Sequence, residues 1–515
     1  MVTHRKPCRT NHFKYYLCGF SMRRVCGIEV CGIRLWCLGT ILIPLYLVSY
    51  TCVSQQTGYQ IKAKVRGWHD TVCYFGNYFG KYNSVKDTTR IDKEGNFIFK
   101  GKDKLPGGIY LLIFPNKTWL ELLIDKEQNI TLETDTGKLV ENMKIKGSEE
   151  SEMFYKYLKF ISQKQKAADP LKKHIAKLNE DSIARITTKK DSIRIMQEKV
   201  TEIEKEREKY MEDFISKNQE YFLTAIFKAQ KDPVVPETPV LPNGRKDSLF
   251  PYRYYKDHFW DNIPPADDRL LRTPIFHMKL KQFFEKIVVQ DPDSINKESD
   301  ILVAKTKGNK ETFKYIVWYL TTTYENHTIM GMDAVFVHQV ENYYMTKQAY
   351  WVDTVTNEKI IHRALTIKPL LLGKPAPPII MQDTLDKNVP LYDVKAKYTV
   401  VIFWDPDCGH CQKVVPKLRD EYEKKLKLKG VQVYAVDIED NAEKWKKFII
   451  DNKMDWINVH DKYKQYPLRQ LYDIYSTPVI YLLDENKKIK AKRIDAEQLD
   501  GYIDFLGKMS ERRNK

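Results

Sequence analysis

Hydrophobic and polar residues alternate in short segments over residues 57–148. Ile61, Ala63 and Val65 are separated by basic residues, which is the period of a strand with one buried face. The turn at residues 92–95 leads into a second such segment. Further short apolar segments follow at residues 96–99, 107–114, 120–124 and 130–133. Short strands at this spacing predict a small antiparallel sandwich or barrel, an all-β sandwich-like domain over residues 57–148.

From residue 149 onward the hydrophobic period changes to three or four residues. Ile193, Met196, Val200 and Ile203 recur at this spacing with Lys and Glu between them. The pattern predicts a pair of amphipathic helices over residues 149–230, the second of which starts at Pro170. We interpret the apolar stripe as core packing. A dimerisation seam is the alternative, and it would make the protein a dimer.

Proline recurs at every third residue from Pro233 to Pro242, so residues 232–245 are predicted to form an extended loop. The aromatic and basic run at residues 250–260 has the composition of a stacking surface for bases or peptides. We interpret it instead as a packed helix, because aromatic residues are usually buried. Residues 269–365 show a helical pattern again. Together these segments predict an all-α middle domain over residues 149–365.

Strands and helices alternate after the boundary at residues 370–378. The predicted strands are residues 400–404, 431–437, 479–483 and 489–493, and the predicted helices are residues 411–427, 442–452 and 499–506. Alternation with short loops is typical of an α/β sheet, which we expect over residues 373–512.

An uncharged run covers residues 35–53 and follows Arg23, Arg24 and Arg34. This is the composition of a secretory signal, and residues 1–54 are predicted to be a leader. The run is also nearly long enough to span a bilayer, so a membrane anchor is the second interpretation. A lipid-modified Cys52 is the third.

Charge and cysteine content bear on the partners and the compartment of the protein. The formal net charge is +17, but the basic residues alternate with acidic ones, as in residues 199–209. This indicates a solvated surface, and we predict no nucleic-acid partner. Of nine cysteines, Cys73, Cys408 and Cys411 are the ones that follow residue 52. One close pair with few other thiols is typical of an exported protein in an oxidising compartment.

The candidate chemistry lies at Cys408 and Cys411, between a predicted strand and a predicted helix. Two thiols at this spacing can form a disulfide and reopen, which is the chemistry of thiol-disulfide exchange. A zinc site would need more ligands, and haem attachment would need a histidine where Gln412 stands. The histidines of the middle region (His258, His277, His327 and His338) lack the spacing of a helical metal site. We therefore predict no metal and no cofactor.

Cys73 is a second candidate nucleophile because His69 and Asp70 are close to it in the sequence. Nothing in the pattern brings the three side chains together, so we interpret Cys73 as an ordinary structural residue.

Several motifs carry a resemblance to known families. The segments 92–99, 107–110 and 145–151 resemble the N-terminal domain of unknown function of many secreted bacterial thioredoxin-like proteins, and the middle region resembles the helical domain that often follows it. Phe403-Trp404, the Cys408-Gly409-His410-Cys411 motif, Pro416 and Ser476-Thr477-Pro478 follow the thioredoxin pattern. Residues 373–512 resemble a thiol-disulfide oxidoreductase of the TlpA/ResA type, which implies a thioredoxin fold.

The resemblance implies roles for individual residues. Cys408, at the start of a helix whose N–H groups favour a thiolate, would attack, and Cys411 would resolve the mixed disulfide. His410 would help to stabilise the thiolate. Pro478 would be a cis-proline opposite the pair, and Thr477 would offer its backbone to an extended substrate. Trp404, the buried aromatic residue of the strand, is placed with the substrate-binding residues.

The sequence departs from the thioredoxin pattern at three positions near the pair. Ile402 and Val414 stand where relatives carry the carboxylates that exchange the proton of the second cysteine. Asp407, next to Cys408, would oppose formation of the thiolate.

These features predict an exported thiol-disulfide oxidoreductase of the periplasm or cell envelope, anchored to the membrane if the leader is retained. Its partners would be protein thiols or disulfides and a redox partner protein. The alternative is an envelope binding or scaffold protein with an accessory thioredoxin-like domain.

Overall fold

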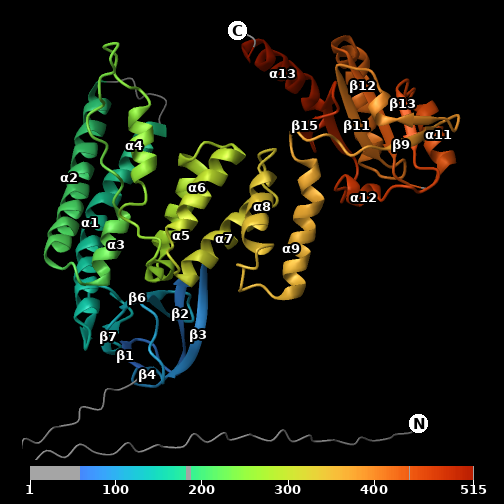
Figure 1. Ribbon diagram of the computed structural model, residues 1–515. Coiled ribbons are helices and arrows are strands. Elements are labelled where there is room, and N and C mark those ends of the chain that lie inside the picture. The colour runs from blue at the N-terminus through green and yellow to red at the C-terminus, as the bar shows by residue number, and fades with distance from the viewer. Residues whose placement is uncertain (1–57, 181–186, 440, 514–515) are drawn as a thin grey trace, which may run out of the picture. The chain divides into compact units, whose positions relative to one another are not determined.

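The computed structural model describes residues 58–180, 187–439 and 441–513 (Figure 1). The predicted leader, with its uncharged run at residues 35–53, lies outside the described residues. Within the described ranges, no helix combines the length and the apolar character needed to cross a membrane.

The N-terminal part of the described chain is rich in strands, as predicted, and contains two four-stranded sheets. One sheet has the order β4-β1-β7-β8, formed by β1 (Tyr59–Arg66), β4 (Asn96–Gly101), β7 (Asn129–Asp135) and β8 (Lys144–Lys146). The other has the order β3-β2-β5-β6, formed by β2 (Thr71–Phe79), β3 (Tyr82–Ile91), β5 (Gly108–Ile113) and β6 (Trp119–Ile124). β1 and β7 are parallel. The expectation of wholly antiparallel pairing was therefore wrong, because the chain between β1 and β7 passes through the other sheet.

The middle region is helical, as predicted. Its helices are α1 (Glu149–Glu180), α2 (Thr187–Lys217), α3 (Phe222–Gln230), α4 (Phe250–His258), α5 (Pro274–Gln282), α6 (Pro292–Ala304), α7 (Lys310–Tyr324), α8 (Asp333–Gln339) and α9 (Thr354–Ile367). Pro170 lies inside α1 and does not start a helix, which corrects that prediction. Pro170 is exposed, so water can reach the carbonyl that loses its hydrogen bond.

The apolar stripe of α2 packs inside the chain. α1 and α2 lie side by side (Figure 1). The ring of Tyr210 stacks on Phe160 of α1 with 4.7 Å between ring centroids, and Phe214 packs edge-on against Phe227 of α3. These contacts support the core-packing interpretation, and the dimer stays a prediction.

The strand-rich and helical regions share one hydrophobic core, which extends from Ile61 to Ile367. The turn between β2 and β3 touches α7 directly. A Cβ atom on Gly80 would lie 2.0 Å from the ring of Tyr315, and Gly80 has a positive φ of +57°, so glycine is required there. The backbone N–H of Lys81 donates to the Tyr315 hydroxyl at 2.9 Å.

The C-terminal region is an α/β domain with a seven-stranded sheet in the order β10-β9-β13-β12-β11-β14-β15. The strands are β9 (Ile380–Asp383), β10 (Asn388–Pro390), β11 (Tyr398–Trp404), β12 (Val431–Asp437), β13 (Ile457–His460), β14 (Val479–Asp484) and β15 (Ile489–Lys492). Its helices are α10 (Cys411–Glu421), α11 (Ala442–Asp451), α12 (Leu468–Leu471) and α13 (Leu499–Arg513). Apolar clusters cover both faces of the sheet, and β11 is buried throughout.

Candidate redox site

The paired cysteines lie where the buried strand β11 ends and α10 begins. Cys411 is the first residue of α10 and is fully buried, whereas Cys408 lies in the preceding turn and is partly exposed. The backbone N–H of Cys411 donates to the Cys408 sulfur at 3.4 Å. Both residues are free thiols in this structure, so the disulfide between Cys408 and Cys411 stays a prediction.

A loop distant in the sequence faces the pair. The Thr477–Pro478 peptide bond is cis, as the resemblance implied. The thiol of Cys408 donates to the carbonyl oxygen of Thr477 at 3.4 Å. The fold therefore brings Cys408, Thr477 and Pro478 together, with a backbone carbonyl next to the more exposed sulfur.

The environment of Cys408 favours its thiolate. Partial burial works against the charged form, but hydrogen bonds outweigh it and hold the pKa of Cys408 below its ordinary value. They come from the side chain of Thr477, from the backbone and thiol of Cys411, and from the backbone of His410. The backbone N–H groups at the start of a helix act here as expected.

Cys411 has the opposite character. Burial raises the pKa of the Cys411 thiol to about 12, against smaller lowering effects from Thr477 and the backbone of Asp405. The pair therefore combines one accessible sulfur that favours the thiolate with one buried sulfur that favours the thiol. This is the asymmetry that an attacking and a resolving cysteine require.

Two neighbours of Cys408, His410 and Asp407, make contacts that the sequence did not indicate. His410 is exposed, and it lowers the pKa of Cys408 through its backbone. Asp407 was expected to oppose the thiolate, but Lys444 of α11 donates to both of its carboxylate oxygens at 2.8 and 2.9 Å. The ammonium group offsets the negative charge of Asp407. No sequence signal indicated Lys444, because it lies on a helix far along the chain.

Trp404 was placed with the substrate-binding residues, and the structure corrects this. The indole is fully buried in β11 and packs against Phe448 of α11 at 4.9 Å between ring centroids. A completely buried side chain has no surface to offer a substrate. Trp404 instead supports the strand that precedes the pair, which is the family role the resemblance also implied.

Ile402 is buried in the centre of β11, and Val414 is half-buried on α10. Both are apolar, so neither supplies a carboxylate for proton exchange at Cys411. As the sequence indicated, no acidic side chain occupies either of the two positions from which relatives exchange the proton of the second cysteine.

A cavity of about 400 Å³ lies beside the pair. His410 and Val414 line it on the α10 side, and Tyr475, Ser476 and Pro478 line it on the side of the cis-proline loop. The cavity therefore lies between the start of α10 and the cis-proline loop.

The other sequence candidates do not form a reactive site. Cys73 is fully buried in β2, and burial raises its pKa to about 12. The ring of His69 contacts the carbonyl oxygen of Lys93 and not the thiol. Among the described residues no group of His, Cys, Asp and Glu side chains has the arrangement of a metal site.

A buried central strand that leads into a Cys-x-x-Cys turn, a helix and a facing cis-proline defines a thioredoxin-like protein. Residues 372–492, in the C-terminal domain, match the AhpC/TSA family. The matched residues include the pair and the cis-proline loop.

Relatives of this domain are named thiol-disulfide oxidoreductases. The thiol-disulfide oxidoreductase ResA of Bacillus subtilis is 27% identical over 117 residues, which cover 23% of this chain and 64% of ResA. The chain thus spans less than two thirds of that curated relative. A solved domain of a possible thiol-disulfide isomerase from Cytophaga hutchinsonii is 49% identical, with a TM-score of 0.27, covering 28% of this chain and 98% of that one. The thioredoxin domain of a thiol-disulfide oxidoreductase from Bacteroides vulgatus is 33% identical, with a TM-score of 0.25, covering 26% and 96%.

Two families of domains of unknown function match parts of the chain before residue 372. Residues 59–154 match DUF4369, and residues 223–368 match DUF5106. The chain therefore carries two regions of unknown function before the part that matches the AhpC/TSA family.

Proposed function

We propose that this chain is a thiol-disulfide oxidoreductase that exchanges disulfides with other proteins through Cys408 and Cys411. The observation that carries the proposal is the opposite character of the two sulfurs. The pKa of the accessible Cys408 is lowered, whereas the pKa of the buried Cys411 is raised to about 12. A pair that only stapled the backbone would need no such difference.

The proposed reaction begins when the Cys408 thiolate attacks one sulfur of a substrate disulfide. The substrate S–S bond breaks, the leaving sulfur takes a proton, and a mixed disulfide joins Cys408 to the substrate. Cys411 then loses its proton and attacks the Cys408 sulfur, which releases the second substrate thiol. The substrate gains two electrons and two protons, and the pair becomes a disulfide that a dithiol partner protein reduces again. The reverse sequence oxidises a substrate.

In this scheme Thr477 and Pro478 bind the substrate. The Thr477 carbonyl lies beside the Cys408 sulfur, so an extended substrate strand can pair with the loop backbone while its own sulfur reaches Cys408. The backbone of His410 supports the thiolate, and the exposed ring of His410 lines the cavity next to the loop.

The proposed location is the cell envelope or periplasm. The uncharged run at residues 35–53 behind basic residues supports export, and the scarcity of cysteines after residue 52 supports an oxidising compartment. The substrates are then thiols or disulfides of envelope proteins.

Trapping tests the proposal. The Cys411→Ser variant keeps the attacking sulfur but lacks the resolving one, so mixed disulfides with substrates should accumulate at Cys408 and disappear with dithiothreitol. The wild-type chain should reduce insulin with dithiothreitol as the electron source. The Cys408→Ser variant, which lacks the attacking sulfur and should keep the fold, should do neither.

The scaffold alternative makes a different prediction. A binding protein would retain its partners and its cellular phenotype when both cysteines are replaced by serine. If the double variant behaves as wild type and Cys411→Ser traps nothing, the redox proposal is wrong.

A further inference from the structure

The loop that carries Thr477 and Pro478 is anchored at its start by Asp473, between α12 and β14. Asp473 is buried, with 7% of its surface exposed, and it has a positive φ of +53°. A buried carboxylate must be paired to be tolerated, so its partners fix where the loop begins.

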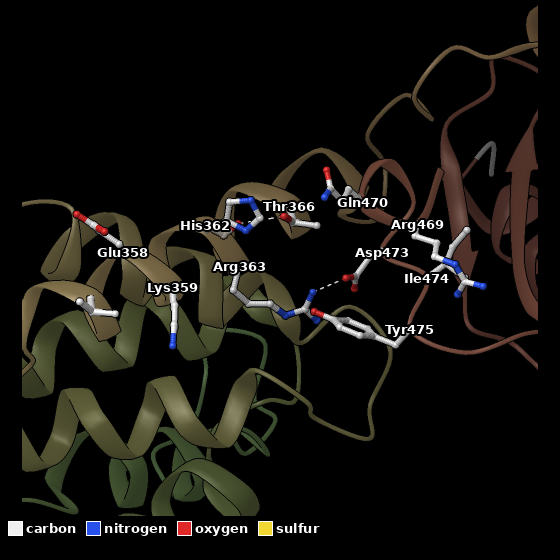
Figure 2. Close-up of a pocket in the computed structure, with 11 residues that line it drawn as sticks. Glu358, Lys359, His362, Arg363, Thr366, Arg469, Gln470, Asp473, Ile474 and Tyr475 are labelled. Atoms are coloured by element: carbon white, nitrogen blue, oxygen red, sulfur yellow. Dashed lines mark hydrogen bonds and ion pairs between the residues drawn. The ribbon is translucent and has the colours of Figure 1, made fainter. Parts of the chain in front are cut away.

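Two arginines from different regions hold the two oxygens of this carboxylate. Arg493, next to β15, donates to Oδ2 at 2.5 Å and to the backbone carbonyl of Asp473 at 3.2 Å. Arg363 of α9, in the helical region, donates to Oδ1. The side chain of Arg363 is itself mostly buried, at 14% exposed, so solvent screens the pair little. Figure 2 shows Arg363 reaching from α9 to Asp473.

Arg363 makes a second contact with the same loop. Its guanidinium lies over the ring of Tyr475, 5.0 Å from the centroid, although Tyr475 is otherwise 73% exposed. Tyr475 lies between Asp473 and the cis-proline. It lines the groove of about 570 Å³ between α9 and the loop (Figure 2) and also the cavity beside His410 and Pro478.

We infer that Arg363 is a positioning residue of the redox site, through which the helical region sets how the loop binds protein substrates. The inference rests on the proposed function, because it takes Thr477 and Pro478 as the substrate-binding groups. Arg363 touches neither sulfur. Its loss leaves one oxygen of a buried carboxylate without its cation and frees the ring of Tyr475. The loop should then bind an extended substrate less well, while the chemistry of Cys408 is unchanged.

The experiment compares a protein disulfide with a small one in the full chain. Arg363→Ala should raise KM for insulin about tenfold, which corresponds to one charge-assisted hydrogen bond, with kcat changed less than about twofold. The rate with 5,5′-dithiobis(2-nitrobenzoic acid), which needs no loop contact, should equal that of wild type. Arg363→Lys keeps the positive charge, so its KM for insulin should lie between those of wild type and Arg363→Ala.

A double-mutant cycle tests whether Arg363 acts through Asp473. Asp473→Asn should also raise the KM for insulin. The KM of the double variant should not exceed that of the more strongly affected single variant, because the two residues form one unit. The matched control is Arg253→Ala, which breaks an arginine–aspartate pair with Asp247 inside the helical region and should leave both assays unchanged.

The outcomes separate this inference from the proposed function. An active wild type with an unaltered KM in Arg363→Ala overturns the inference alone. Parallel losses with insulin and the small disulfide also overturn it, because they indicate damage to the whole domain. A wild type inert with both disulfides overturns the proposed function, and the inference falls with it.

Discussion

Cys73 and Cys408 show how two positions in one chain give the same side chain opposite properties. Cys73 lies inside β2, in the strand-rich region, where burial raises its pKa to about 12. Cys408 lies in a turn before α10, where backbone and side-chain hydrogen bonds outweigh partial burial and lower its pKa. The difference lies in the groups that contact each sulfur. Thr477 and the backbone of His410 and Cys411 act on Cys408, whereas His69 and Asp70 form no reactive site with Cys73.

The largest expected difference between Cys73 and Cys408 is in their rates of alkylation. At pH 7 a thiol with a pKa near 12 is ionised to roughly one part in a hundred thousand, so Cys73 should be inert to a short pulse of iodoacetamide. Cys408 should react at least about a thousandfold faster in the reduced protein. Its rate should rise with pH through a midpoint below the ordinary value for cysteine, since only the thiolate reacts. Peptide mass mapping reads the two sites separately, and a Cys408 midpoint at or above the ordinary value contradicts the prediction.

Replacing Cys73 should cost more free energy of unfolding than replacing Cys408, although Cys408 is the more reactive thiol. Cys73→Ala removes a fully buried group from the shared core and should cost about 1–2 kcal/mol, while disulfide exchange is unchanged. Cys408→Ala removes a partly exposed side chain and should cost less than about 0.5 kcal/mol. Urea unfolding followed by tryptophan fluorescence measures both. Equal costs for the two variants would show that the environments differ less than the structure indicates.

The smallest effect is expected at Lys444. Lys444→Ala leaves the charge of Asp407 unpaired next to Cys408, which should raise the pKa of the thiol and slow its alkylation at pH 7 by roughly twofold, because the pair is exposed and screened. Lys447→Ala is the matched control, since Lys447 lies on the same helix and pairs with Asp451 away from the site. An unchanged rate in Lys444→Ala would mean that Asp407 does not influence the sulfur.

Local signals predicted the parts of the fold whose residues are close in sequence. The apolar run before Cys408 predicted β11, because a strand is marked by adjacent residues. The cis bond before Pro478 was implied only by the family resemblance. β3 was not predicted: nearly all of its residues are exposed, so no alternation marks it. The placement of Trp404 among the substrate-binding residues failed because a family motif does not report which way a strand residue faces.

Short-range sequence patterns could not predict the charged residues that contact the redox site from elsewhere in the chain. Lys444 reaches Asp407 from another helix, and Arg363 reaches Asp473 from another region of the chain. Charged residues are common on both α9 and α11, so no spacing distinguishes the two that meet a carboxylate. Their partners are fixed only by the tertiary fold.

The close approach of Gly80 to Tyr315 has a consequence for how the chain can be divided. A fragment that ends near residue 148 would lose the aromatic wall that the β2–β3 turn rests on, and would expose half of a common interior. Such a fragment should aggregate rather than fold. The strand-rich and helical regions should therefore fold together or not at all, whereas the sheet around Cys408 is packed on both faces by apolar clusters of its own.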